Sequence, residues 1–236
     1  FLSENDDFAR LCEKNKINFI GPSADSMNLC GDKMRCKAAM LKAKVPTVPG
    51  SPGLVKDADE AEKIANEIGY PVMLKSVYGG GGRGIRIVNT DQELQDGYET
   101  VTAESIAAVG KSAIIVEKFL EKTRHIEYQM CRDHHGNAVH LFERECSIQR
   151  RNQKLIEQTP SPAVDEAKRE EIGELVVKAA EAVDYTNLGT AEFLRADNGE
   201  FYFIEINARL QVEHPISEMV SGLDFVKLQL DIANGE

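Results

Sequence analysis

The sequence of 236 residues lacks the features that mark several classes of protein. No apolar run approaches the roughly 20 residues needed to span a bilayer, and no signal peptide opens the chain. The five cysteines form no CxxC pair and are odd in number, which favours a reducing compartment such as the cytoplasm and leaves a mitochondrial parent open. The 28 basic residues are outnumbered by 39 acidic ones, giving a net charge of −11. This balance argues against a partner such as nucleic acid or an anionic membrane and fits an acidic enzyme.

Hydrophobic residues make up 42% of the chain, enough for the core of one large domain or two small ones. The sequence does not begin with methionine, so we expect it to be a piece of a longer protein. Patterning predicts a helix over 3–16 and a short strand over 17–20, which Gly21-Pro22 ends. We interpret 1–22 as the tail of an upstream domain and 23–46 as a helical connector.

The stretch VPTVPGSPG at 45–53 marks a domain boundary because proline and glycine interrupt regular structure. A compact pattern of strands and helices follows over 47–119, centred on the glycine loop at 79–84. Such loops bind phosphate through exposed backbone N–H groups. This loop lacks the ending of a P-loop and precedes a strand, so neither the P-loop nor the dinucleotide fingerprint is satisfied. We interpret 47–119 as a lid with a phosphate-covering flap, a merely flexible turn being the alternative.

The remaining residues, 120–236, are predicted to form a second subdomain of strands and helices, which makes the fold class α+β. A hairpin that carries acidic residues lies near its end. The other predicted elements are strands at 125–130 and 138–145, an irregular basic segment at 147–162, and helices at 165–184 and 224–233.

The acidic hairpin turns at Asn198-Gly199, the strongest short signal for a two-residue type I′ loop. With that loop, the antiparallel ladder places Glu192 directly opposite Glu205, and Asn207 lies on the same face. Like charges opposite each other destabilise a sheet, a conflict that a cation between the carboxylates would relieve. Two carboxylates and an amide oxygen suit Mg²⁺. The alternatives are a solvated acidic face, or a longer loop that changes the register.

Charged and polar residues continue at every second position after the hairpin: Arg209, Gln211 and Glu213. If the chain stays roughly extended there, these side chains line up beyond the metal face. Arginine suits a small planar anion, and a carboxylate can serve as a general base. The segment therefore predicts an anion site beside the metal.

These pieces together match a known family. In chain order they are Lys33, Lys75 with GGGGRG at 79–84, VEKFL at 116–120, HIEYQ at 125–129, CSIQRRNQK at 146–154 and EINARLQVEHP at 205–215. The chain closely resembles the biotin carboxylase component of biotin-dependent carboxylases, within the ATP-grasp superfamily. The resemblance covers essentially the whole chain, and its last two motifs are highly specific.

The resemblance implies an ATP-grasp fold in which two α+β subdomains grip a nucleotide. It also implies a reaction in two stages. Bicarbonate attacks the γ-phosphate of ATP to give carboxyphosphate, and the CO₂ is then transferred to the ureido nitrogen of biotin. The implied cofactors are ATP, Mg²⁺ or Mn²⁺, and biotin as the substrate on a carrier. The implied partners are a biotin carboxyl carrier domain and a carboxyltransferase, with a homo-oligomeric parent.

Motif positions imply three sets of site residues. The nucleotide set is Lys33, Lys75, Gly80, Gly81, Gly82, Glu117, Lys118, Leu120, His125, Gln149 and Leu194. The metal set is Glu192, Glu205 and Asn207. The bicarbonate set is Lys154, Arg209, Gln211, Val212 and Glu213, of which Lys154, Arg209 and Glu213 are the implied catalytic residues and Glu213 the base.

Two positions depart from the family pattern, Tyr78 in the glycine run and Asn152 in the basic segment. The family also has a downstream arginine that this chain does not reach, so we expect the piece alone to bind Mg²⁺-ATP and to carboxylate biotin poorly or not at all. Two other readings stay open. One is a different ATP-grasp ligase, such as half of a carbamoyl-phosphate synthetase. The other is a nucleotide-binding module without turnover.

Overall fold

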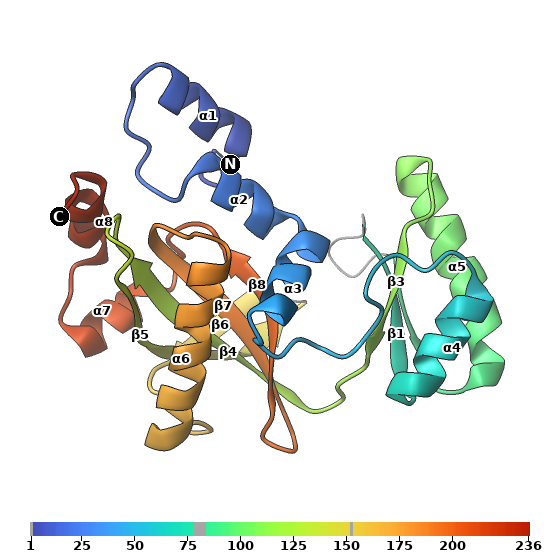
Figure 1. Cartoon of the computed structure of the whole chain (residues 1–236). Coiled ribbons are helices and arrows are strands. Elements are labelled where there is room, and N and C mark those ends of the chain that lie inside the picture. Colours follow the sequence, from blue (N-terminus) through green and yellow to red (C-terminus); the bar gives the residue numbers. More distant parts are fainter. Residues whose placement is uncertain (1, 78–83, 152) are drawn as a thin grey trace. The chain divides into compact units, whose positions relative to one another are not determined.

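The computed structural model describes residues 2–77, 84–151 and 153–236. The chain divides into two compact units: unit 1 comprises 1–47 and 123–236, and unit 2 comprises 48–122. Both units combine helices with an antiparallel sheet (Figure 1), which confirms the α+β class. Within the described part of the chain, no helix is long and apolar enough to cross a bilayer.

Unit 2 is a small sheet with two helices (Figure 1). Its strand order is β2-β1-β3, and β1 is antiparallel to both neighbours. The Asp57 side chain caps the first helix by accepting from the backbone N–H of Glu60, and Gly69 ends that helix. The glycine loop at 79–84 lies almost entirely outside the described residues. The elements are α4 (Ala58–Ile68), β1 (Val72–Ser76), β2 (Ile85–Val88), α5 (Asp91–Val109) and β3 (Ile114–Lys118).

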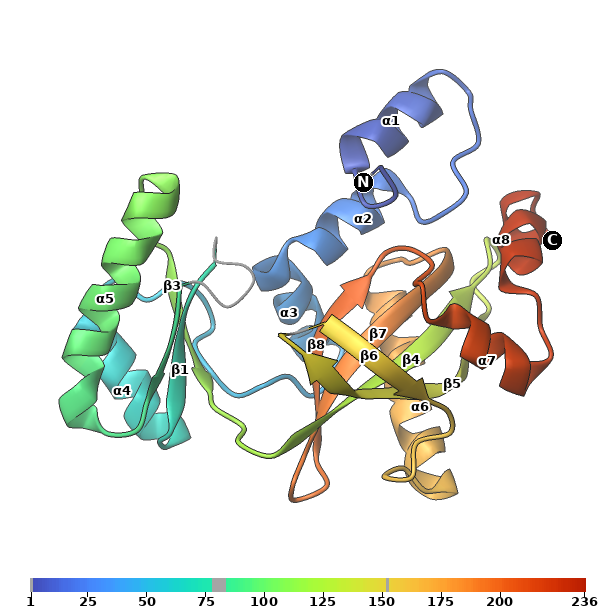
Figure 2. The same ribbon diagram turned by 180° about the vertical axis from the view of Figure 1, so that it is seen from behind.

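Unit 1 is built on a five-stranded sheet of order β6-β5-β4-β7-β8 (Figures 1 and 2). Three helices, α2, α3 and α6, pack against one face of this sheet, whereas α7 lies against β5. The helices are α1 (Asp6–Lys14), α2 (Ala24–Gly31), α3 (Lys33–Lys42), α6 (Glu166–Ala182), α7 (His214–Ser221) and α8 (Phe225–Ala233). The strands are β4 (Thr123–Arg132), β5 (Ala138–Arg150), β6 (Gln153–Gln158), β7 (Asn187–Ala196) and β8 (Phe201–Asn207).

The main core of unit 1 lies between the sheet and these three helices. Ile126, Tyr128 and Met130 alternate along β4 and point into it, where Phe193 and Phe203 join them. The intervening residues of β4 face the opposite side of the sheet, because successive side chains of a strand alternate. One strand therefore serves an apolar face and a polar face.

Three local predictions are wrong. Residues 17–20 form no strand, since no described strand pairs with them and Ile17 and Ile20 are exposed. The basic segment is not irregular: β5 runs on to Arg150 and pairs with β6. Helix α7 was not predicted, because the alternation from Arg209 to Glu213 resembles an extended chain.

The hairpin between β7 and β8 has the predicted pairing of Glu192 with Glu205, but its loop is longer than predicted. Ala196 bonds to Glu200 through its N–H, so the loop has three residues, Asp197 to Gly199, and only the glycine has positive φ. This loop shifts the register by one residue. A bulge in β8 at Ile204 shifts it back, so Glu192 pairs with Glu205 as expected.

Candidate functional site

Four charged residues lie in register across four strands on the sheet face that carries the polar side chains of β4. Arg144 of β5 pairs with Glu127 of β4, Glu127 with Glu192 of β7, and Glu192 with Glu205 of β8. Without the bulge at Ile204, Glu205 would follow the alternation of Phe201 and Phe203 into the core. The bulge therefore turns the last carboxylate toward the others.

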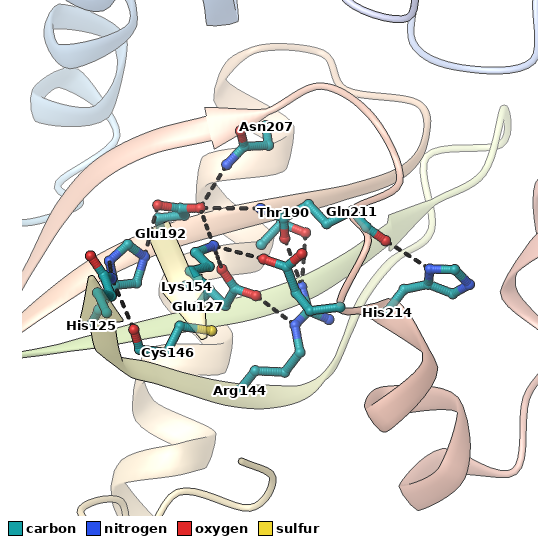
Figure 3. A network of polar contacts seen from close by, with 12 residues as sticks. His125, Glu127, Arg144, Cys146, Lys154, Thr190, Glu192, Asn207, Gln211 and His214 are labelled. Atoms are coloured by element: carbon teal, nitrogen blue, oxygen red, sulfur yellow. Dashed lines mark hydrogen bonds and ion pairs between the residues drawn. The ribbon is translucent and has the colours of Figure 1, made fainter. Parts of the chain in front are cut away.

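The ammonium group of Lys154 lies among three carboxylates (Figure 3). Its Nζ contacts Glu127, lies 2.9 Å from Oε1 of Glu192 and lies 2.8 Å from Oε1 of Glu213. These partners come from β4, from β7 and from the start of α7. Burial alone would lower the pKa of Lys154, but the carboxylates of Glu127 and Glu192 raise it well above its ordinary value. Lys154 is therefore a fixed positive charge.

Glu192 is the most highly connected of these carboxylates (Figure 3). Its Oε1 accepts from Nδ2 of Asn207 at 2.9 Å and from Nε2 of Gln211 at 3.1 Å, and its Oε2 lies 2.8 Å from Nε2 of His125. Burial opposes ionisation of this carboxyl, yet His125 and Lys154 lower its pKa well below the ordinary value. It carries a negative charge across the physiological range.

Glu213 occupies the position just before α7, and its side chain makes no capping hydrogen bond to that helix. The carboxylate is buried against Lys154. Burial would raise the pKa of Glu213, but the hydrogen bond and the charge of Lys154 lower it. The group is therefore ionised at neutral pH and available as a proton acceptor.

Arg144 completes this network and is not among the residues predicted from the sequence. The guanidinium is fully buried and donates to Glu127, among others. A partial signal was present: Glu127 is a charged residue between Ile126 and Tyr128 in one predicted strand, and Arg144 is a cation inside the other. Charges of opposite sign in two such strands favour a buried pair.

Arg209 does not join Gln211 and Glu213, and the expected alternation fails. Strand β8 ends at Asn207 and the chain then turns. Nε of Arg209 lies 3.0 Å from Oε2 of Glu4, while its Nη2 reaches Oδ1 of Asn207 only at 3.5 Å.

The other predicted residues of unit 1 surround this network. Nζ of Lys33 lies 3.3 Å from Oε2 of Glu205, and the lysine side chain is 72% exposed. Gln149 donates to the backbone of Cys146 and its Nε2 lies 3.3 Å from Nδ1 of His125. Leu194 pairs with His125 across β7 and β4. The side chain of Val212 points outward, with the residue 90% exposed.

A hollow of about 230 Å³ opens beside Glu205. Its lining comes from α2, from the end of β8, which includes Asn207, and from Lys33 and Glu4. The hollow thus lies next to two of the predicted metal ligands.

In unit 2, Lys75 and Glu117 form an ion pair of 2.6 Å between β1 and β3. Nζ of Lys118 donates to the backbone oxygens of Gly69 and Tyr70, and Leu120 is half-buried. The predicted phosphate-binding glycines, Gly80, Gly81 and Gly82, lie outside the described residues.

The predicted metal ligands fit a hard cation. Glu192 and Glu205 are paired across the hairpin, and Asn207 donates to Glu192 through its amide nitrogen, which leaves the amide oxygen as its possible ligand beside the two carboxylates. Glu127 also belongs to two other groups of side chains that could ligate a metal. One group contains His125 and Glu192, and the other contains Cys146 and Glu213. There, however, the ammonium of Lys154 already supplies the positive charge.

Comparison with known protein families gives two matches along the chain. Residues 32–236 match the family described as carbamoyl-phosphate synthase L chain, ATP binding domain. Residues 1–27 match the family described as biotin carboxylase, N-terminal domain.

Curated proteins match over the whole chain. It is 53% identical over 236 residues to the 2-oxoglutarate carboxylase small subunit of Hydrogenobacter thermophilus, covering 50% of that protein. It is 51% identical to the biotin carboxylase of Nostoc sp., covering 53% of it. The chain thus spans about half the length of these relatives.

Solved structures agree with these relatives. A Campylobacter jejuni biotin carboxylase, solved as a complex with β,γ-ATP, matches with a TM-score of 0.91 and 48% identity, over all of this chain and 53% of that one. The biotin carboxylase domain dimer of the Hydrogenobacter thermophilus enzyme, with MgADP, ADP and bicarbonate, matches with a TM-score of 0.90 and 53% identity, over all of this chain and 52% of that one. The chain therefore belongs to the family of the carbamoyl-phosphate synthase L chain ATP binding domain, has the ATP-grasp fold, and corresponds to that part of biotin carboxylases.

Proposed function

We propose that this chain supplies the ATP-binding and bicarbonate-activating part of a biotin carboxylase. In this reaction bicarbonate attacks the γ-phosphate of ATP, carboxyphosphate forms, and its CO₂ is transferred to biotin on a carrier. The observation that carries the proposal is the convergence of Lys154, Gln211 and Glu213 on one sheet face. A fixed cation, an amide donor and an ionised carboxylate are what a small acidic anion needs for binding and deprotonation.

We call the site formed by these three residues the bicarbonate pocket. In it, Lys154 and the amide of Gln211 bind the oxygens of bicarbonate, and Glu213 takes its proton. Glu213 suits that role because it is buried, ionised at neutral pH and 2.8 Å from the lysine. Arg209 and the backbone of Val212 contribute as further anion contacts, as the family resemblance implies. Arg209 would have to leave Glu4 to do so, since the two form an ion pair of 3.0 Å.

ATP is bound by the nucleotide set, and the cation by Glu192, Glu205 and Asn207. Mg²⁺ or Mn²⁺, when bound, neutralises charge that develops on the transferred phosphoryl group. Lys33 supports this assignment because it already contacts the exposed side of Glu205. The proposed nucleotide set is Lys33, Lys75, Gly80, Gly81, Gly82, Glu117, Lys118, Leu120, His125, Gln149 and Leu194.

We also propose the domain roles given by the sequence: 47–119 as the lid, 120–236 as the subdomain with the metal and bicarbonate sites, 1–22 as the tail of an upstream domain and 23–46 as the connector. The compact unit over 48–122 supports the first, and the family match over 1–27 supports the third. The proposed partners are a biotin carboxyl carrier domain and a carboxyltransferase. The proposed parent is a homo-oligomer, for which the dimer of the Hydrogenobacter thermophilus relative is the support, and its proposed compartment is the cytoplasm, with a mitochondrial parent as the alternative.

The test is an assay of the full-length protein with radiolabelled bicarbonate, Mg²⁺-ATP and free biotin. We expect label in carboxybiotin and ATP cleavage that depends on bicarbonate. Bicarbonate-dependent cleavage with ammonia as the preferred acceptor would instead assign the protein to carbamoyl-phosphate synthesis. Nucleotide binding without any cleavage would reduce the proposal to a binding module.

A further inference from the structure

We propose that Arg144 is the positioning residue of the bicarbonate pocket: it fixes the amide orientation of Gln211 and, through Glu127, the place of Lys154. This inference rests on the proposed function and assigns a role to a residue that the predicted site did not include. Arg144 is 0% exposed, so it does not itself touch the substrate. It acts through the residues that do.

All five N–H groups of the Arg144 guanidinium have acceptors, of which Glu127, Thr190 and Gln211 are labelled in Figure 3. Acceptors from several separate segments of the chain converge on this one group, which therefore holds those segments together. The contacts are Nε to Glu127 Oε1 at 2.6 Å, Nη1 to Gln129 Oε1 at 2.8 Å and Ser217 Oγ at 2.9 Å, and Nη2 to Thr190 Oγ1 at 3.2 Å and Gln211 Oε1 at 2.8 Å.

The first consequence concerns Gln211. A guanidinium has donors and no acceptor, so Gln211 must turn its Oε1 toward Arg144. Its Nε2 then points the other way, where it donates to Glu192 at 3.1 Å. Arg144 thereby decides which end of the amide faces the pocket. A flipped amide would present an oxygen to an incoming anion and repel it.

The second consequence concerns Lys154. Glu127 is fully buried, and its two oxygens are divided between Arg144 and Lys154. Arg144 thus holds one end of a carboxylate whose other end holds the ammonium group. A buried carboxylate that lost one of two cations would move or take up a proton, and the lysine would lose a fixed partner.

A third contact links Arg144 to α7. Ser217 lies one turn into that helix and is buried, and its hydroxyl accepts from Nη1 at 2.9 Å. Glu213, the proposed base, occupies the N-cap position of the same helix. Arg144 therefore contacts Gln211 directly, reaches Lys154 through Glu127, and reaches Glu213 through Ser217 and one helical turn.

The adjacent residue of β5 provides a matched control. Glu143 is also fully buried and forms a bidentate pair with Arg169 of α6, with distances of 2.7 and 2.8 Å. Because Glu143 and Arg144 are neighbours in a strand, their side chains lie on opposite faces of the sheet. Both glutamates are fully buried and paired with an arginine; the Arg169 side chain is 16% exposed and makes two hydrogen bonds to its glutamate where Arg144 makes one, and only Arg144 contacts the pocket.

The experiment compares Arg144→Lys with Arg169→Lys in the full-length protein. Lysine keeps the charge but loses the planar fork that reaches several acceptors. For Arg144→Lys we expect the KM for bicarbonate to rise by about 10- to 100-fold, the usual effect of losing a partner that orients a binding residue. The KM for ATP should stay within about twofold, since this change removes no predicted ATP contact. Arg169→Lys should lower the unfolding temperature and leave both KM values unchanged.

Ser217→Ala gives a second variant that retains the buried charge and removes one acceptor only. It should raise the KM for bicarbonate by about threefold, less than Arg144→Lys, because it removes only one of the five acceptors that hold Arg144. An unchanged bicarbonate KM in folded Arg144→Lys, or in Ser217→Ala if the lysine variant does not fold, would overturn the inference. Equal rises in both KM values, or the same rise in Arg169→Lys, would assign Arg144 a structural role only.

A crystal structure of Arg144→Lys separates this inference from the proposed function. We expect the Gln211 amide to turn, so that it no longer donates to Glu192. An unchanged amide contradicts the inference whatever the enzyme does. If the wild-type protein shows no bicarbonate-dependent ATP cleavage, the proposed function fails, and the amide orientation still decides whether Arg144 positions Gln211.

Discussion

The two faces of the five-stranded sheet of unit 1 use the same strands for different purposes. On one face, Ile126 and Tyr128 pack with Phe193 against helices. On the other, Glu127 and Glu192 surround an ammonium group. Alternation along a strand separates apolar from charged side chains by one residue, so chemistry and stability are built into the same backbone.

The energetic balance of the two faces differs. A fully buried apolar side chain contributes roughly 1.5–3 kcal/mol to stability. Burying a carboxylate costs several kcal/mol of folding free energy. Even with well-placed cations, its net contribution to stability is only close to zero. The charged face is therefore expensive to build and contributes little to folding. The proposed function gives this face a role that folding does not, so substitutions on the two faces should have opposite signatures.

The largest effect is expected on the charged face, from Glu213→Gln. Glutamine keeps the size of the side chain and cannot accept a proton from bicarbonate. Bicarbonate-dependent ATP cleavage should fall by about 10²- to 10⁴-fold, the usual contribution of a positioned base. The unfolding temperature should change little, because the glutamine oxygen can still accept from Lys154, which also keeps the carboxylates of Glu127 and Glu192. Steady-state kinetics with a thermal melt check both, and retained activity would remove Glu213 from the role of base.

Phe193→Ala should give the opposite signature on the apolar face. The ring is fully buried and lies edge-on to Tyr128 and Phe203, with centroids 6.2 and 5.8 Å away. Removing it should cost about 3–5 kcal/mol of unfolding free energy. Chemical denaturation measures this loss, and the KM for bicarbonate of the folded protein should stay as in the wild type. A large rise in that KM would contradict the assignment of bicarbonate binding to the charged face alone.

Glu205→Gln should weaken Mg²⁺-ATP binding by about tenfold or more, because it removes one charged oxygen ligand. Glu200→Gln is the matched control, an exposed glutamate of the same hairpin with the same charge change. Calorimetry should find the effect in the first variant only. Equal affinities in the two variants would exclude Glu205 as a metal ligand.

Val212→Ala should have the smallest effect. The side chain is 90% exposed, so stability should change by no more than about 0.5 kcal/mol. The proposed contact of Val212 with bicarbonate is through the backbone, which alanine retains. A clear rise in the KM for bicarbonate would mean that the side chain also takes part.

The pairing of Glu192 with Glu205 was predictable from the sequence, although the local reasons were incomplete. The Asn-Gly signal located the turn, yet the loop gained a residue and a bulge at Ile204 compensated. The bulge could not be predicted from the residues around it. It forms because Phe203 and Ile206 both have to point into the core. Register was thus fixed by burial more than by the turn.

Other parts of the site depended on contacts between distant segments. Arg144 became significant only once Glu127, Gln211 and Ser217 were brought to it from three other elements. Strand β6 was missed because its charged residues resemble a solvated run, and Lys154 in fact turns toward buried carboxylates. Sequence patterns report local preference, and neither feature is local.

The central claim is that the charged face of this sheet binds bicarbonate, and direct binding tests it most simply. Bicarbonate should be titrated into the full-length protein saturated with MgADP, comparing the wild type with Lys154→Met. Lys168→Met, which removes an exposed ion pair with Glu171 on α6, controls for the loss of charge. The account predicts saturable binding in the wild type and in Lys168→Met, and none in Lys154→Met. Equal binding in all three proteins would contradict it.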